Sequence, residues 1–459
     1  MIYNRPEYWL AKTETVVPYL TFSSPISFTL AVGDATKHWD GTLEYSTDKT
    51  AWDTWDGTIA LSSATSGNKD VLYLRGTGNT KIGYYSEDKN DYIPWAISGT
   101  DVRCNGNIET LLDYTTVEAG QHPTMAEGCF VGMFFGCTAL TQAPVLPAMT
   151  LTSGCYSGMF AGCANLTQAP VLPAMTLTSG CYSGMFAGCA NLTQAPVLPA
   201  MTLADYCYQQ MFSGCTALTQ APVLPAMTLT SGCYSGMFQG CTSLTQAPAL
   251  HATTLAIDCY QQMFSGCTSL TQTPVLPAMT LTDNCYCYMF EDCTSLTQAP
   301  ALPATTLANE CYYYMFFGCT NLTQAPALPA TTLTVNCYSF MFQGCTSLTQ
   351  TPALPATTLA IGCYDNMFFG CTNLTQAPAL PATTLTVYCY RGMFYGCTSL
   401  KLSTTQTDEY TQEYRIPSSG TGTTATNALT NMFFSTGGTF KGTPTINTTY
   451  YLSNTNSVV

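Results

Sequence analysis

The apolar positions of the chain repeat with a fixed period of 26 residues. The dipeptide Met-Phe recurs at this interval from Met133 to Met393, eleven times in succession and without an insertion. The typical copy reads Cys-Tyr-x-x-Met-Phe-x-x-Cys, followed by Leu-Thr-Gln-Ala-Pro-x-Leu-Pro-Ala-x-Thr-Leu. A constant period of this length indicates a solenoid, in which each copy forms one coil and stacks on the next.

The two halves of the repeat predict different elements. On a helix, the two cysteines, Tyr, Met and Phe of one copy fall within an arc of about 140°, which we expect to face the core. A glycine before the second Cys, such as Gly162, is suited to end that helix. Pro144 and Pro147 exclude a long strand in the other half, so a short strand near 140–143 and an extended stretch are expected. We therefore predict a mixed α/β solenoid of the leucine-rich-repeat type, about 50 Å long at ~4.8 Å per coil.

The chain outside the repeats has a different composition. Short apolar segments at 28–32, 42–45 and 71–74 are separated by Gly and Asp turn signals, which is typical of a small antiparallel sandwich. Trp39, Trp52 and Trp55 are expected in or near its core. The predicted organisation is an N-terminal segment (1–17), a β-sandwich-like domain (18–103), an N-terminal cap with a helical turn at 107–114 (104–128), eleven repeats (129–398) and a polar C-terminal cap (399–459).

Charge and hydropathy narrow the function classes. Only 9% of the residues are charged and the net charge is −14, which disfavours a nucleic-acid partner. The hydrophobic content of 46% is ample for a core. No apolar run reaches the ~18 residues of a membrane span, so membrane insertion is not expected. The N-terminal sequence lacks the basic start and apolar stretch of a secretory signal.

Cysteine is unusually frequent, with 24 residues, and 22 of them form the eleven pairs of the repeat. The uniform Cys-x7-Cys spacing without a nearby His does not fit a zinc site. Two cysteines eight residues apart on one helix are ~12 Å apart in rise, beyond the ~7 Å limit for a disulfide. Disulfides between neighbouring coils remain an alternative. We favour free thiols that stack in columns as small buried hydrophobic groups.

Residues suited to catalysis are scarce. The chain has three histidines, His38, His122 and His251, and lacks the Gly-x-Ser-x-Gly, phosphate-loop and His-Glu-x-x-His motifs. The adjacent carboxylates Glu291 and Asp292 would point apart on a helix, unlike the facing acids of a glycosidase. We therefore expect neither an enzyme nor a cofactor.

The copies differ mainly at the x positions after Tyr and just before the first Cys, which lie off the predicted buried arc. Tyr, Ser, Asn and Asp at these places are typical of recognition surfaces. The competing explanation is neutral drift of the sequence at positions that face the solvent. Aromatic groups are densest in the later copies, where we expect an exposed interaction strip. The candidate ligand-binding residues are Tyr288, Tyr313, Tyr314, Phe317, Phe340, Asp365, Asn366, Phe369, Tyr388, Arg391 and Tyr395.

The string Met-Phe-Gln-Gly-Cys-Thr-Ser-Leu-Thr at 341–349 resembles the signature of BspA-like leucine-rich repeat proteins. The resemblance covers about residues 104–440. It implies an adhesin, encoded by a gut or oral bacterium or its phage, that binds a protein or glycan receptor at a cell surface. The location would be extracellular, on a cell or a virion. A phage tail or virion receptor-binding protein, a homo-oligomer and a purely structural spacer are the alternatives.

Overall fold

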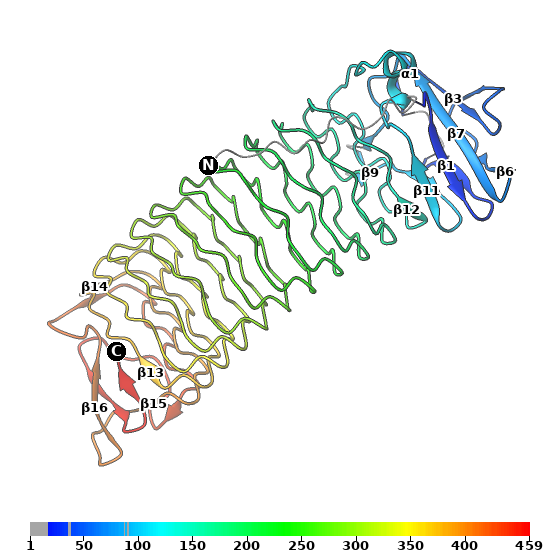
Figure 1. Ribbon diagram of the computed structural model, residues 1–459. Helices are drawn as coiled ribbons and strands as arrows, with labels where there is room; N and C mark the ends of the chain where they lie inside the picture. The colour runs from blue at the N-terminus through cyan, green and yellow to red at the C-terminus, as the bar shows by residue number, and fades with distance from the viewer. Residues whose placement is uncertain (1–16, 35–37, 87, 90) are drawn as a thin grey trace, which may run out of the picture.

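The computed structural model describes residues 17–34, 38–86, 88–89 and 91–459. A stack of coils forms a rod that carries a sheet-rich region at its N-terminal end and a small β cap at its C-terminal end (Figure 1). Of the predicted N-terminal segment, only Val17 lies within the described residues. The stack confirms a repeat solenoid of the leucine-rich type.

The N-terminal region is built from short strands. A seven-stranded sheet has the order β12-β11-β1-β7-β3-β4, with β6 paired to β7, and β10-β2-β5 form a second sheet. The three apolar segments read from the sequence fall in β2, β3 and β7. Two sheets are present, but a sandwich is not confirmed. The strands are β1 Leu20–Ser24, β2 Thr29–Val32, β3 Thr42–Ser46, β4 Asp53–Trp55, β5 Leu61–Ser62, β6 Ala64–Ser66, β7 Lys69–Thr77, β8 Tyr85–Ser86, β9 Asp91–Tyr92, β10 Trp95–Ile97 and β11 Val102–Asn105.

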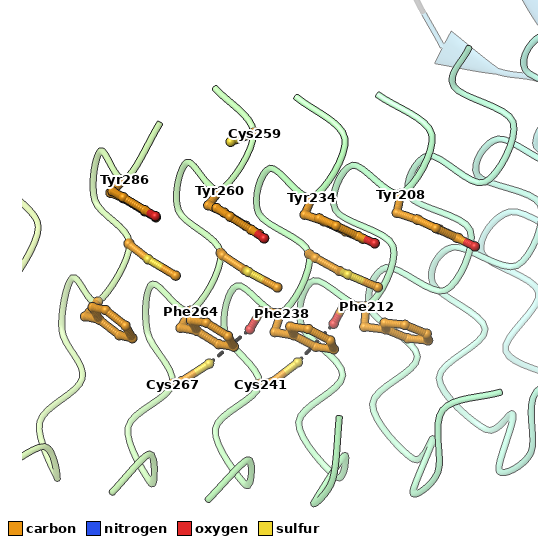
Figure 2. Close-up of a cluster of buried hydrophobic side chains, with 14 of the residues drawn as sticks. Tyr208, Phe212, Tyr234, Phe238, Cys241, Cys259, Tyr260, Phe264, Cys267 and Tyr286 are labelled. Carbon is orange, nitrogen blue, oxygen red and sulfur yellow. Dashed lines mark hydrogen bonds between the residues drawn. The ribbon is translucent and has the colours of Figure 1, made fainter. Parts of the chain in front are cut away.

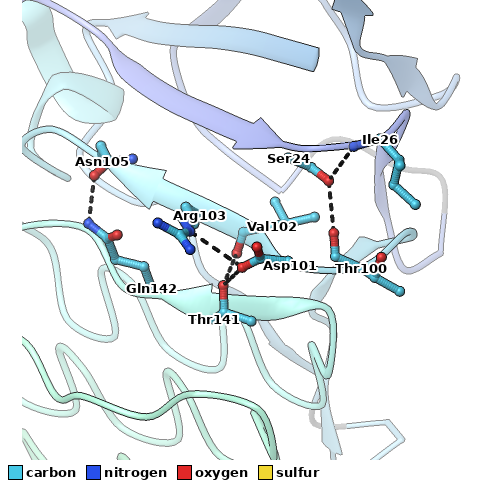
Figure 3. A network of polar contacts seen from close by, with 9 residues as sticks. All are labelled: Ser24, Ile26, Thr100, Asp101, Val102, Arg103, Asn105, Thr141 and Gln142. Carbon is cyan, nitrogen blue, oxygen red and sulfur yellow. Dashed lines mark hydrogen bonds and ion pairs between the residues drawn. The ribbon is translucent and has the colours of Figure 1, made fainter. Parts of the chain in front are cut away.

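The N-terminal sheet continues into the first coil. Strand β11 pairs in parallel with β12 (Leu140–Gln142) of the first coil. Because β11 spans residues 102–105, it continues across the boundary predicted at 103/104 between the β-rich domain and the N-terminal cap. Figure 3 shows the side chains that reinforce this junction. The Thr141 hydroxyl donates to the Asp101 carboxylate at 2.7 Å, and the Gln142 amide donates to the Asn105 side-chain oxygen at 2.6 Å. The sheet therefore covers the open end of the stack.

One helix, α1 (Thr110–Glu118), is found in the described chain. The side-chain oxygen of Asn107 accepts the Glu109 amide at 2.9 Å, and the backbone leaves the helical region at Asp113. Leu111 and Leu112 are fully buried. The helical turn predicted at 107–114 is thus present, and it extends four residues further along the chain than the sequence indicated.

The predicted helix in each repeat is wrong. Residues 153–162 form consecutive turns in which every second amide hydrogen-bonds within the coil, three residues back, as Met159 does to Tyr156 at 3.2 Å. The alternate amides donate to the next coil instead, as Phe160 does to Met185 at 2.9 Å. An α-helix would direct all of these amides four residues back. The mixed α/β class is therefore not confirmed: the described chain is almost entirely β and loop.

The inward positions of the turns were nevertheless predicted correctly. In coil after coil the first Cys, Tyr, Met, Phe and second Cys are at most 4% exposed. The tyrosine rings stack at 5.7–5.9 Å between centroids from Tyr156 to Tyr390. The phenylalanine rings stack at 5.4–5.8 Å from Phe134 to Phe433. Near-parallel planes at these distances give the offset stacking that aromatic rings favour.

All 24 cysteines are free and buried, as the free-thiol interpretation predicted. The second thiol of each coil from the second onward also donates a hydrogen bond to the preceding coil (Figure 2). For example, Cys241 and Cys267 donate to the Phe212 and Phe238 carbonyls, both at 3.1 Å. Burial raises the pKa of Cys241 to about 12, so the group stays a protonated donor. Cysteine therefore combines apolar packing with a bond between coils.

The proline halves of the coils and the C-terminal cap complete the fold. Between β12 and β13 the coils are linked on this side by isolated bridges, such as Gln168 to Gln194 and Thr176 to Thr202. Prolines explain the lack of longer strands, because they cannot donate to a ladder. A four-stranded sheet of order β16-β19-β15-β18 forms most of the cap. The remaining strands are β13 Gln376–Ala377, β14 Thr384–Leu385, β15 Lys401–Ser403, β16 Tyr410–Arg415, β17 Thr423–Thr424, β18 Gly437–Gly438, β19 Thr449–Ser453 and β20 Ser457–Val458.

Candidate ligand-binding surface

The turns of each coil require a left-handed backbone at three places: before the first Cys, before Met and before the second Cys. In the early coils glycine occupies all three, as at Gly154, Gly158 and Gly162. Later coils keep the positive φ but carry side chains there. The bulky ones are Tyr206 (φ 58°), Tyr288 (56°), Tyr314 (54°), Phe340 (57°) and Tyr388 (58°). This conformation costs an L-residue roughly 1–2 kcal/mol, and glycine avoids that cost.

Three of these strained residues form a column that we call the aromatic ladder: Tyr288, Tyr314 and Phe340. Tyr314 stacks on Tyr288 at 4.8 Å and on Phe340 at 4.5 Å between ring centroids. Tyr313 meets Tyr314 edge-on at 4.5 Å, and Phe317 lies 5.2 Å from the same ring. The structure thus brings five of the predicted site residues together.

A second aromatic column is formed by the residues that directly follow the Met-Phe pair in the last coils and in the C-terminal cap. Phe369 stacks on Tyr395 at 4.6 Å, and Tyr395 stacks on Phe434 at 5.0 Å. Phe434 was not predicted as a site residue, although it is 44% exposed. The sequence could have identified Phe434, because it follows Met432-Phe433 in the same way that the predicted residue Tyr395 follows Met393-Phe394.

Asp365 does not fit the prediction of an exposed ligand-binding group. It is only 5% exposed and forms two hydrogen bonds with Arg391, one of them from Nε at 3.0 Å. Asn366 also donates to its carboxylate at 2.7 Å, and the Arg391 guanidinium lies over the Tyr388 ring at 4.4 Å. Burial raises the pKa of Asp365, and the Arg391 contacts oppose that shift. The polar and charged groups of these four predicted residues therefore interact with one another, and their contacts do not require a ligand.

The other candidates are half-buried, whereas the sequence predicted an exposed strip. Stacking covers the ring faces between neighbouring members of the aromatic ladder. Burial raises the pKa of Tyr288 and of Tyr314 to about 12, so both phenols are neutral hydrogen-bond donors near pH 7. The surface is apolar with a few polar atoms, as in the core of a protein interface.

The histidines of the described residues lie apart from this surface, whereas the carboxylates of Glu291 and Glu310 lie close enough to act electrostatically on Tyr288 and Tyr313. His122 contacts the buried carboxylate of Glu109 at 2.8 Å in the N-terminal cap, and burial raises the pKa of Glu109. His251 is exposed on the proline side of its coil. No group of three or more His, Cys, Asp or Glu side chains suited to a metal occurs in the part of the chain that the structure describes.

One protein-family model matches most of the solenoid. The model of the BspA type leucine rich repeat region (6 copies) matches residues 131–245, 233–340 and 286–414. The chain belongs to the BspA-type leucine-rich-repeat family. No curated protein and no solved structure gave a significant match.

Membership of the BspA-type family limits the functional class. The family is built from repeats that bind or support, rather than from enzymatic domains, and it commonly mediates surface adhesion or protein binding. Its members are typically surface-associated. Among the described residues, no helix has the length and apolar character needed to cross a membrane.

Proposed function

We propose that this BspA-type protein is a receptor-binding adhesin whose contact surface is the aromatic ladder with Tyr313 and Phe317. The receptor is a protein on a cell surface, and a glycan is the alternative ligand. The protein would act outside the cell, displayed on a bacterium or on a virion. Those two settings differ in how the chain is anchored, and they share the same binding surface.

The observation that carries the proposal is the left-handed backbone at Tyr288, Tyr314 and Phe340. Glycine occupies the same place in Gly132, Gly158 and Gly184 and avoids the strain. Backbone strain that persists is concentrated at functional sites. A spacer needs only to hold its ends apart, so three bulky aromatic side chains at successive strained positions favour a contact surface over a spacer or neutral drift.

The exposed chemistry favours a protein receptor. Glycan recognition by aromatic residues uses open ring faces, and in this ladder each face between neighbouring rings is covered at 4.5–4.8 Å. Edges and neutral hydroxyls suit the packed core of a protein interface, where Tyr is a preferred anchor. The solenoid has little charge to steer the encounter, so binding depends on short-range contact.

The test replaces the three ladder residues by glycine, which the early coils carry at the same position. We expect the variant Tyr288→Gly, Tyr314→Gly, Phe340→Gly to melt close to the wild type, because relief of strain offsets the lost stacking. The fluorescently labelled wild-type chain should bind at least one cell type in a panel of bacterial and animal cells, measured by flow cytometry. The triple variant should lose that binding.

The matched control is Gln210→Gly with Gln262→Gly, which changes the same position of two other coils. This control should bind as the wild type does. Protease treatment of the cells should abolish binding if the receptor is a protein, and deglycosylation should do so if it is a glycan. Equal binding by the triple variant and the wild type, or no binding to any cell type, would overturn the proposal.

A further inference from the structure

The proline side of the solenoid contains two positions that vary together. Coil 1 begins at Cys129 and each later coil 26 residues on, and ten coils carry the segment Pro-x-Leu-Pro-Ala-y-Thr or a close variant. Wherever x is Val, y is Met, and wherever x is Ala, y is Thr. The Val/Met coils are 1 to 4 and 6, with Val145 and Met149, Val171 and Met175, Val197 and Met201, Val223 and Met227, and Val275 and Met279. The Ala/Thr coils are 5 and 7 to 10, with Ala249 and Thr253, Ala301 and Thr305, Ala327 and Thr331, Ala353 and Thr357, and Ala379 and Thr383.

The large side chains of this face point into solvent. The valines of coils 2, 3, 4 and 6 are 75–79% exposed, and the methionines of the same coils are 53–60% exposed. The Leu and Ala residues between them are buried. None of the ten segments contains a charged residue. A regular apolar stripe of this kind marks an interaction surface rather than scattered surface residues.

The Ala/Thr coils offer the complementary shape. With Ala in place of Val, coils 7 and 8 leave a hollow between their prolines. Its lining residues include Pro300, Ala301, Pro303, Pro326, Ala327 and Pro329. The Val/Met coils thus project apolar knobs, and the Ala/Thr coils lack them and form a shallow apolar hollow at coils 7 and 8.

The order of the two coil types is complementary to its own reverse. Coil 1 would face coil 10, and then 2 would face 9, 3 would face 8, 4 would face 7 and 5 would face 6. Every one of these five pairs joins a Val/Met coil to an Ala/Thr coil. Coils 5 and 6 break the simple division into a Val/Met half and an Ala/Thr half, but they too pair an Ala/Thr coil with a Val/Met coil. We propose that two copies of this chain pack antiparallel through their proline faces, about a two-fold axis between coils 5 and 6.

A second copy is the partner that this face fits best. A two-fold interface pairs residue i with residue j and residue j with residue i, which the reversed order satisfies. Both copies have the same rise per coil, so knobs and hollows stay in register along the whole stripe. Large residues opposite small ones allow close interdigitation. The uncharged segments also place no like charges against each other.

The available area is consistent with a stable dimer. A fully exposed Val or Met side chain presents roughly 60–120 Å² of apolar surface, so the eight of coils 2, 3, 4 and 6 at the observed exposure offer on the order of 500 Å² per copy. Standard interfaces bury about 800 Å² on each partner, and the prolines and alanines beside the stripe can supply the difference.

The ends of the face are partly covered by the caps of the same chain. Val145 donates its amide to Gly106 at 2.9 Å, and Ala379 donates to Val459 at 2.8 Å. These residues belong to coils 1 and 10, which are each other's partners in the proposed dimer. The four inner pairs therefore carry the interface, and each occurs twice by symmetry. The turn segments, with the aromatic ladder, are not required for it.

The test exchanges residues between facing coils. In coil 7, Ala301→Val with Thr305→Met puts a knob against the knob of coil 4 of the partner. We expect the dimer dissociation constant, measured by sedimentation velocity, to rise at least about tenfold. Adding Val223→Ala and Met227→Thr in coil 4 restores a knob opposite a hollow and should restore the dimer. All four new residues already occupy these positions in other coils, so the melting temperature should change little.

The matched control combines the same coil 7 change with Val197→Ala and Met201→Thr in coil 3. Coil 3 faces coil 8, not coil 7, so this variant should remain as weakened as the coil 7 variant. Rescue by coil 4 and not by coil 3 supports the antiparallel register. A wild-type chain that sediments as a monomer at every concentration would overturn the proposal, as would equal rescue by both coils or a dimer insensitive to all of these changes.

Discussion

Replacement of Phe264 by Ala tests whether stacked rings hold the coils together. Phe264 is 0% exposed, and its ring lies 5.8 Å from Phe238 and 5.7 Å from Phe290. Truncation removes a large buried side chain and interrupts the column at one coil. Such changes cost 3–5 kcal/mol, and the cost rises with the cavity that remains.

The surrounding backbone places the expected value in the upper part of that range. Phe238 donates its amide to Met263, and Phe264 donates to Met289, both at 3.0 Å. These bonds fix the distance between coils on each side of the missing ring, so the cavity cannot collapse. We expect a loss of about 4–5 kcal/mol in the free energy of unfolding.

Urea denaturation followed by circular dichroism measures the effect. Each coil contacts only its neighbours, so the truncation should also let the two sides of the stack unfold separately and broaden the transition. Gln261→Ala in the same turn is the control and should change the stability by less than about 1 kcal/mol. A loss below about 1 kcal/mol for Phe264→Ala, or equal losses at the two sites, would refute the stacked-column explanation.

Two further predictions concern the thiols and the turns. In the folded protein few thiols should react with iodoacetamide, since all are buried and their pKa values are raised, and denaturation without reductant should expose all 24. Labelling of only a few after denaturation would show disulfides. Gly184→Ala should cost roughly 1–2 kcal/mol in urea denaturation, from its φ of 60° alone, because its Cβ would meet nothing within 4 Å. Gly158→Ala should cost more, because its Cβ would lie 2.7 Å from the Tyr92 ring, and unchanged stability in both variants would contradict the left-handed turns.

The candidate site was predictable to the extent that it depends on residue type. Aromatic residues at variable positions identified Tyr288, Tyr314 and Phe340 as neighbours on successive coils, and the structure stacks them. Asp365 and Arg391 are also 26 residues apart and so were predictable as neighbours on successive coils, but the residue types alone do not show that this ion pair holds the Asp365 carboxylate in a buried position. The exposed side chains of the proline half were overlooked, because that half looks nearly constant when its coils are compared one with another.

The sequence by itself determined the coil length, the number of coils and the inward residues, because a 26-residue repetition of apolar groups can be buried only by stacking. It did not determine the backbone of the turns. Inward residues at positions 1, 2, 5, 6 and 9 of the motif fit a turn of four residues as well as a helix of about 3.6, and nine residues are too few to separate the two periods. The choice depends on where the amides donate. Half of them find their acceptors on the next coil, 25 residues further along the chain, as Tyr156 does at Cys181. Only the tertiary structure brings those acceptors within hydrogen-bonding distance, so only the stack decides that the segment forms turns rather than a helix.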